Sequence, residues 1–130
     1  MRLFPAKLLW VDGLAGLSVG ALLLALHRPL LAWYGFEPDF LALQTGANLA
    51  YGAYAISLAR LRARPLALLV LLACANAVWG LLCLRWAWLF RASATALGLA
   101  HLVLEALVVF ALAASEWRAR RELAAPSGPG

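Results

Sequence analysis

Long apolar runs alternate with short polar segments along the whole chain. The runs cover residues 8–26, 40–59, 66–84 and 93–115, and each approaches the roughly 20 residues that a helix needs to cross a bilayer. They lack the alternating pattern of a membrane barrel, and backbone amides in lipid must bond within their own segment. The pattern predicts an all-α membrane protein, an antiparallel bundle of four transmembrane helices. We expect residues 1–124 to form this single domain and residues 125–130 to be a disordered tail.

The segments between the runs are short and differ in character. Residues 27–39 mix aromatic, aliphatic and charged side chains, a mixture typical of the headgroup boundary, so we expect this segment to lie along the membrane surface. Residues 60–65 are too few for anything but a tight antiparallel hairpin. After the last run, Glu116 and Arg120 stand four residues apart, which predicts a side-chain pair on a helix that continues into water.

Composition supports the membrane class. Hydrophobic residues make up 65% of the chain and charged residues 13%, whereas soluble domains are about a quarter charged. The formal net charge of +5 does not indicate a nucleic-acid partner, because the arginines stand between apolar runs instead of forming one basic surface. The lipid bilayer is the partner that this composition predicts.

The basic residues also predict an orientation. With four spans, eight Lys and Arg fall on one side and three on the other, and the positive-inside rule makes the first side cytoplasmic. Both termini are then cytoplasmic, and we expect a multi-pass protein of a bacterial cytoplasmic membrane. A cleaved signal peptide is the competing interpretation of the first run, but Asp12 interrupts that run and no cleavage site follows it. The first side carries Arg2, Lys7, Arg60, Arg62, Arg64, Arg118, Arg120 and Arg121, and the second carries Arg28, Arg85 and Arg91.

Each predicted helix carries small or polar residues at helical spacing on one face. Gly16 and Gly20 form a close-approach motif in the first helix, which indicates helix packing within the chain or, as an alternative, a homodimer contact. Because polar groups turned toward lipid are costly, the four polar faces should converge inside the bundle. The converging residues are Asn48 and Tyr51 from the second helix, Asn76 and Trp79 from the third, and His101 and Glu105 from the fourth.

These six residues are the candidate ligand-binding site, a polar cluster within the membrane. His101 and Glu105 form either a structural clamp or a site for a ligand or proton, and two such ligands are too few for a metal site. Asp12 lies near the cytoplasmic end of its helix, and we expect it to be an interfacial tie to Arg60 or Arg118.

Two functional classes follow from this pattern. The leading hypothesis is a membrane protein that binds or passes a small amphipathic or lipid-derived ligand. The alternative is a structural or accessory subunit of a larger membrane complex, with homo-oligomerisation as a related option. An enzyme has the least support, because the sequence contains no catalytic triad order, zinc-protease motif, phosphate loop or cofactor fingerprint, and no cofactor is expected.

Overall fold

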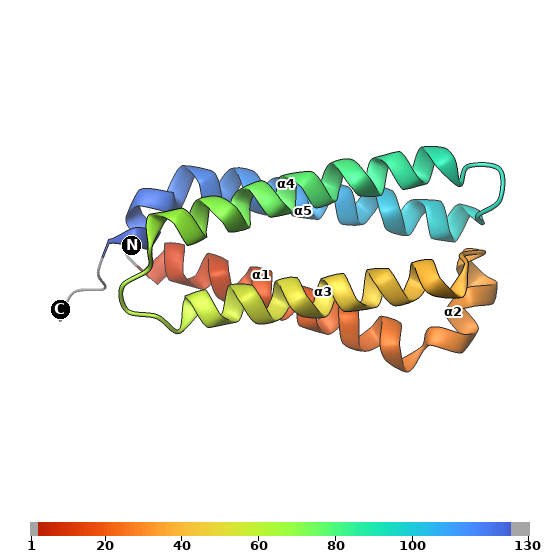
Figure 1. Ribbon diagram of the computed structural model, residues 1–130, viewed down its shortest axis with the longest axis horizontal. Coiled ribbons are helices and arrows are strands. Elements are labelled where there is room, and N and C mark those ends of the chain that lie inside the picture. The colour runs from red at the N-terminus through yellow and green to blue at the C-terminus, as the bar shows by residue number, and fades with distance from the viewer. Residues whose placement is uncertain (1–2, 126–130) are drawn as a thin grey trace.

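The computed structural model describes residues 3–125, which form helices and no β-strand. Four long helices run side by side, and one short helix lies at one end of the bundle (Figure 1). In chain order the helices are α1 (Leu3–Ala25), α2 (His27–Tyr34), α3 (Pro38–Ala59), α4 (Leu66–Leu89) and α5 (Ala96–Ala124). The predicted all-α class is confirmed. From residue 126 onward, the predicted tail lies outside the described residues.

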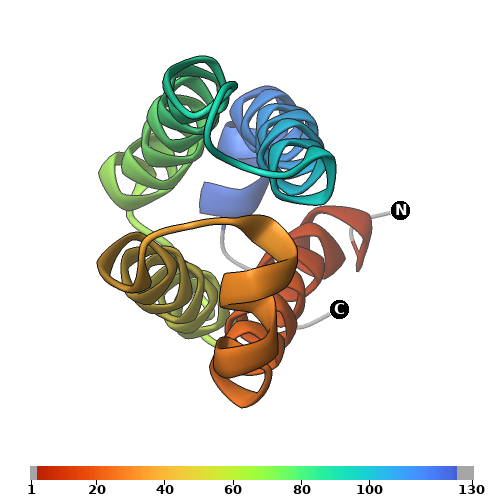
Figure 2. The ribbon, with the colours of Figure 1, turned by 90° about the vertical axis from the view of Figure 1, so that its right-hand side faces the viewer.

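The long helices form two pairs. α1 packs along α3, and α4 packs along α5, whereas the two pairs approach each other less closely. The end view shows the pairs facing each other, with α1 beside α5 (Figure 2). α1 begins and α5 ends at the end of the bundle opposite α2 (Figure 1).

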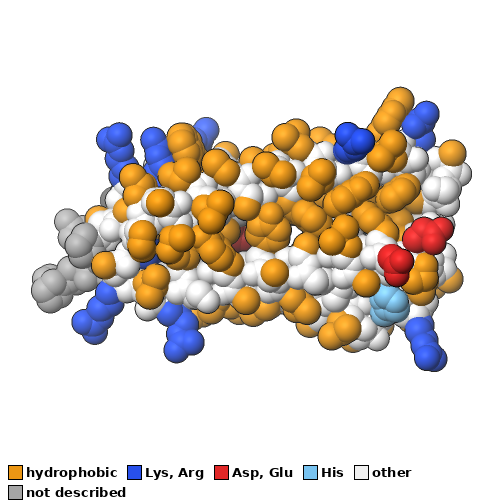
Figure 3. Space-filling view, viewed as in Figure 1, with side chains coloured by type: hydrophobic (Ala, Val, Ile, Leu, Met, Phe, Trp, Pro, Cys, Tyr) orange, Lys and Arg blue, Asp and Glu red, His pale blue; other side chains and the backbone are white. Residues whose placement is uncertain are grey.

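Some helices of the bundle have the length and the composition of membrane spans. Among the described residues, three segments are long and apolar enough to cross a bilayer: Ala6–Ala25, Leu66–Leu89 and Ala96–Ala124. α3 is similar in length, at 22 residues, but is not one of them, because its sequence is more polar. On the face shown in Figure 3, hydrophobic side chains cover the middle and charged side chains gather toward the two ends. Three of the four predicted spans are thus supported.

The segment predicted to lie as a loop on the membrane surface is largely helical. α2 occupies residues 27–34 and ends at Gly35, whose φ of 71° is readily adopted by glycine. The helix places Leu30 and Tyr34 one turn apart on the same face. Leu30 is buried in the apolar core, and Tyr34 packs against that core. Some of the side chains that were expected at the headgroup boundary therefore face the core of the bundle.

Glycines bring α1 and α3 into close contact. A Cβ added to Gly16 would lie 2.9 Å from the Asn48 carbonyl oxygen, and one added to Gly52 would lie 2.6 Å from the Leu17 nitrogen. Backbone atoms cannot move aside as a flexible side chain can, so this contact requires glycine. The close-approach motif of Gly16 and Gly20 is confirmed as a packing contact within the chain.

Arg64 joins two helix ends at the side of the bundle opposite α2. Its Nε and Nη2 donate to the carbonyl oxygens of Leu58 and Ala59 at 2.7 and 3.0 Å, and its Nη1 donates to that of Leu123 at 3.1 Å. The last carbonyls of a helix lack partners within the helix, and a cation suits the negative end of the helix dipole. Burial lowers the pKa of Arg64, but an arginine remains charged at neutral pH.

The α1–α3 contact yields a matched pair of tests on one helix. We expect Gly52→Ala to destabilise the protein by about 1–3 kcal/mol, because the new methyl group meets backbone atoms. Gly46→Ala should be neutral or slightly stabilising, since a Cβ there meets no atom within 4 Å and alanine favours the helix. Thermal unfolding in detergent, followed by circular dichroism, measures both. Equal melting temperatures for the two variants would contradict the packing described above.

Candidate functional site

A cavity of about 240 Å³ lies between the two helix pairs, with side chains from all four long helices in its wall. It contains the six residues predicted to converge, and Asp12 as well. Its polar or aromatic lining comprises Asp12, Asn48, Tyr51, Asn76, Trp79, His101 and Glu105. The structure therefore places every candidate residue at one cavity, although whether a ligand binds there remains a prediction.

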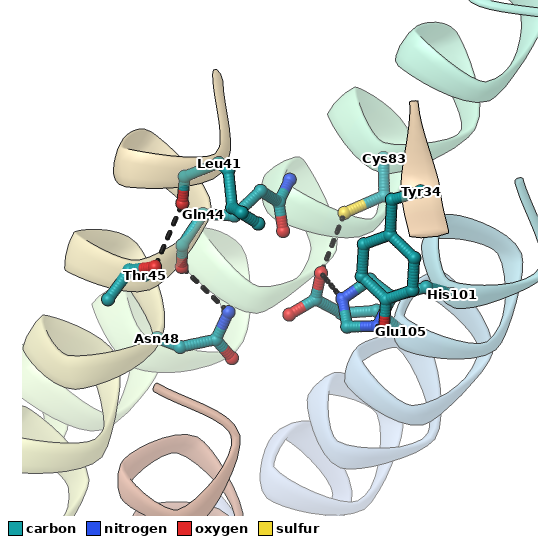
Figure 4. A network of polar contacts seen from close by, with 8 residues as sticks. All are labelled: Tyr34, Leu41, Gln44, Thr45, Asn48, Cys83, His101 and Glu105. Carbon is teal, nitrogen blue, oxygen red and sulfur yellow. Dashed lines mark hydrogen bonds and ion pairs between the residues drawn. The ribbon is translucent and has the colours of Figure 1, made fainter. Parts of the chain in front are cut away.

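The part of the cavity nearest α2 holds a chain of polar contacts (Figure 4). The Tyr34 hydroxyl lies 3.1 Å from Nδ1 of His101, and Nε2 of His101 lies 3.6 Å from Oε2 of Glu105. The Cys83 thiol of α4 donates to the same Glu105 oxygen across 3.6 Å. A thiol is a weak donor and 3.6 Å is too long for a nitrogen–oxygen hydrogen bond, so Glu105 is poorly satisfied.

These contacts favour one tautomer of His101. Because Nε2 faces a carboxyl group, a proton on Nε2 is stabilised, and Nδ1 is left to accept a hydrogen bond from Tyr34. Burial, followed by the nearby Glu105 charge, raises the pKa of Tyr34 above its ordinary value. The phenol thus keeps its proton at neutral pH and can donate a hydrogen bond to Nδ1 of His101.

Tyr34 was not a candidate in the sequence, because its segment was predicted to be a surface loop. It reaches His101 because the end of α2 is fastened to the beginning of α5. The Thr95 amide donates to the Tyr34 carbonyl at 2.9 Å, and the Thr95 hydroxyl donates to the Trp33 carbonyl at 2.5 Å. Gly98 leaves room for this approach, since a Cβ there would collide with the Tyr34 backbone. Gly35 and Gly98 are the sequence features that permit this close contact. The sequence alone does not show that the two glycines lie near each other, so the contact could not be predicted from it.

α3 contributes Asn48 to the cavity wall and carries a buried glutamine one turn before it. Gln44 is fully buried, and both polar atoms of its amide lack hydrogen-bond partners. Asn48, one turn further, donates to the Gln44 carbonyl at 2.9 Å. In Figure 4 the Gln44 side chain extends from α3 toward the side of the cluster that carries Cys83. Gln44 stands four residues before Asn48 in the sequence but was not among the candidate site residues.

Aromatic side chains form the middle of the wall. The rings of Tyr51 and Trp79 lie 6.0 Å apart between centroids, tilted by 49°. The Tyr51 hydroxyl donates to the Ala75 carbonyl of α4 at 3.0 Å, so it bridges the two helix pairs and leaves its ring at the cavity. Tyr54 makes a similar bridge to the Leu68 carbonyl at 2.9 Å.

In the part of the cavity farthest from α2, Asp12 lies beside a second acid, Glu116, instead of the predicted arginine. Asp12 accepts a hydrogen bond from Nδ2 of Asn76 at 3.0 Å, whereas Arg60 or Arg118 was expected as its partner. The same Asn76 nitrogen donates to Glu116 at 2.8 Å. Asn76 therefore joins α1 to α5 through two carboxyl groups.

The prediction that Glu116 lies in water beside Arg120 is wrong. Glu116 is fully buried, because α5 continues to Ala124 and turns this side chain toward the other helices. Arg120 instead stacks on Trp117, 3.9 Å from the ring centroid, and donates to the Trp117 carbonyl at 2.5 Å. Helical spacing alone could not distinguish the two arrangements, since Glu116 is one turn from Arg120 in both.

The cavity reaches the outer surface of the bundle along α5. Leu104 and Val108 line it, yet they are 61% and 52% exposed. Neighbouring wall positions are apolar, among them Val19 of α1 and Leu112 of α5. A molecule entering from lipid would meet an apolar mouth before it reached the polar groups inside.

The Tyr34–His101 contact predicts a nitrogen NMR signature. His27 and His101 are the two histidines of the chain, so His27→Gln leaves a single imidazole signal. At neutral pH that signal should show a proton on Nε2 and a hydrogen-bonded Nδ1. Tyr34→Phe should shift the Nδ1 resonance because its donor is gone, and Tyr54→Phe, which removes a distant hydroxyl, should leave it unchanged. A proton on Nδ1 in the His27→Gln protein would refute this assignment.

Comparisons with protein-family models, curated proteins and solved structures found no match for this chain. We therefore infer its function from the side chains that line the cavity.

Proposed function

We propose that this chain is a four-span membrane protein, with both termini on the cytoplasmic side, whose cavity binds or passes a small amphipathic or lipid-derived molecule. Three spans meet the length and composition required, and α3, packed along α1, is the fourth. The end of the bundle where α1 begins and α5 ends carries most of the basic residues. The positive-inside rule favours the cytoplasm for that end.

The polarity of α3 is consistent with a span, because its polar side chains are buried inside the bundle or bonded to their own helix. Gln44, Thr45 and Asn48 are buried inside the bundle. The hydroxyls of Thr45 and Ser57 donate to carbonyls one turn earlier, at 2.9 and 2.7 Å, and so satisfy themselves within the helix. The 22 residues of α3 extend about 33 Å, enough to cross a hydrocarbon core.

Buried polar atoms without hydrogen-bond partners support the proposal that the cavity binds a ligand. Glu105 Oε1 is buried at the cavity without a hydrogen-bond partner, among aliphatic side chains of α5. Gln44 Oε1 and Nε2, one turn from the cavity residue Asn48, are also buried without partners. Buried polar atoms that remain unpaired cost about 1–3 kcal/mol each. A ligand with a hydrogen-bond donor at one end and an apolar body would satisfy Glu105 and fill the remaining space. Glu105 is the observation that carries this proposal.

The size of the cavity limits the ligand. Pockets for drug-sized molecules have volumes of roughly 300–1,000 Å³, and this one is slightly smaller, at about 240 Å³. A small molecule, or the part of a lipid next to its headgroup, fits these dimensions. The opening at Leu104 and Val108 would admit an acyl chain from the bilayer.

Native mass spectrometry of the protein extracted with its own membrane lipids tests the proposal. We expect the wild type to retain a small molecule and Ala15→Phe to lose it, because Ala15 lines the cavity. Leu14→Phe is the matched control, since the neighbouring Leu14 is 54% exposed on the lipid-facing surface. Glu105→Gln should weaken retention about 10-fold or more, because an amide group replaces one of the two carboxyl oxygens that would bind the ligand.

Two outcomes would count against the ligand. Retention that is equal in Ala15→Phe and Leu14→Phe would place the bound molecule elsewhere on the surface. A wild-type protein that carries no small molecule but co-purifies with another membrane protein would favour the accessory-subunit hypothesis.

A further inference from the structure

Three helices bring two acids together at a single asparagine. Asp12 of α1, Asn76 of α4 and Glu116 of α5 are 4%, 2% and 0% exposed. Because one Asn76 nitrogen bonds Asp12 Oδ2 at 3.0 Å and Glu116 Oε1 at 2.8 Å, the two carboxyl oxygens lie within about 6 Å of each other. This arrangement differs from the His101–Glu105 pair, which lies about three turns away along α5.

The charges of this group do not balance if both acids are ionised. The amide that joins them is neutral, and Glu116 Oε2 is buried with no hydrogen-bond partner at all. Like charges at this separation in a medium of low dielectric strongly disfavour double ionisation, as in paired catalytic carboxyls. One added proton halves the charge and gives one of the acids a hydroxyl that can donate to the other or to a ligand.

Tyr51 and Asn76, which face the pair, carry no positive charge that could balance it. From α3, Tyr51 is the titratable group that faces Asp12, and its hydroxyl already donates to the Ala75 carbonyl. From α4 the pair meets Asn76, which is not titratable. Among the described residues, no group of three or more His, Cys, Asp or Glu is placed to hold a metal ion.

We propose that Asp12 and Glu116 form a proton-binding site in which the two carboxyl groups hold one proton between them beside Asn76. Asp12 and Asn76 also line the cavity, so the site borders it. Binding converts a pair of charge −2 into one of charge −1, and the proton comes from water. The site stands on the packing of Asp12, Asn76 and Glu116 and does not depend on the proposed cavity ligand.

Infrared spectroscopy of the full-length protein in lipid nanodiscs tests the site. Only a protonated carboxyl group shows the carboxylic C=O stretching band, so the wild type at neutral pH should show such a band from the pair. Asp12→Asn and Glu116→Gln each keep a carbonyl oxygen for Asn76 and remove one acid, and either should abolish or shift the band. Transfer to D2O should shift it as well, because a proton that comes from water is replaced by deuterium.

Matched controls separate the pair from other acids. Glu122→Gln removes an exposed acid of the same helix and should leave the band unchanged. Glu105→Gln should remove at most a separate band, and the Asp12–Glu116 band should persist. A wild-type spectrum without any carboxylic band would overturn the site even if a variant fails to fold.

Three results would overturn the proton site. The first is a neutral-pH wild-type spectrum with only carboxylate bands. The second is a carboxylic band that survives both Asp12→Asn and Glu116→Gln. The third is a band that appears or vanishes with the sodium concentration at constant pH, which would indicate a metal cation held by the carboxylates.

Discussion

In the proposed four-span topology, polar side chains inside the hydrocarbon layer must find their partners within the protein, and this constraint would organise the bundle. α3 shows it most clearly, because Gln44, Thr45 and Asn48 all face the interior. Where local bonds suffice, as for Thr45 and the Leu41 carbonyl, the helix satisfies itself. Where they do not, side chains from different helices meet, and the remaining unpaired atoms concentrate at the cavity and beside it.

Small residues hold the helices together within a pair, and longer polar side chains join one pair to the other. Gly16 and Gly52 allow α1 and α3 to touch through their backbones, which makes that pair tight. Between the pairs, contact comes from longer side chains such as Asn76 and Tyr51, which reach across a gap. The same gap that requires these bridges provides the volume of the cavity. Tight packing within pairs and bridging between them are therefore two consequences of one architecture.

Helical spacing predicted much of the site but not its ends. Asn48, Asn76, His101 and Glu105 could be expected together because each lies on the polar face of a long apolar helix. Tyr34 could not, since its position depends on the contact between the end of α2 and Thr95. Glu116 was misplaced because Arg120 offered a plausible partner at helical spacing, while the actual partner, Asn76, is distant in sequence.

The proposed topology depends on α3 crossing the membrane. Its polar residues must find partners inside the bundle only if lipid surrounds that helix. Cysteine labelling in intact cells tests this most directly, in a protein whose Cys74 and Cys83 are replaced by alanine. Single cysteines at Ala32 in α2 and Ala63 in the turn after α3 occupy exposed positions on either side of that helix. A membrane-impermeant maleimide should label Ala32→Cys from outside, and Ala63→Cys only after the cells are opened. Equal labelling of both in intact cells would show that α3 does not cross and would contradict the account.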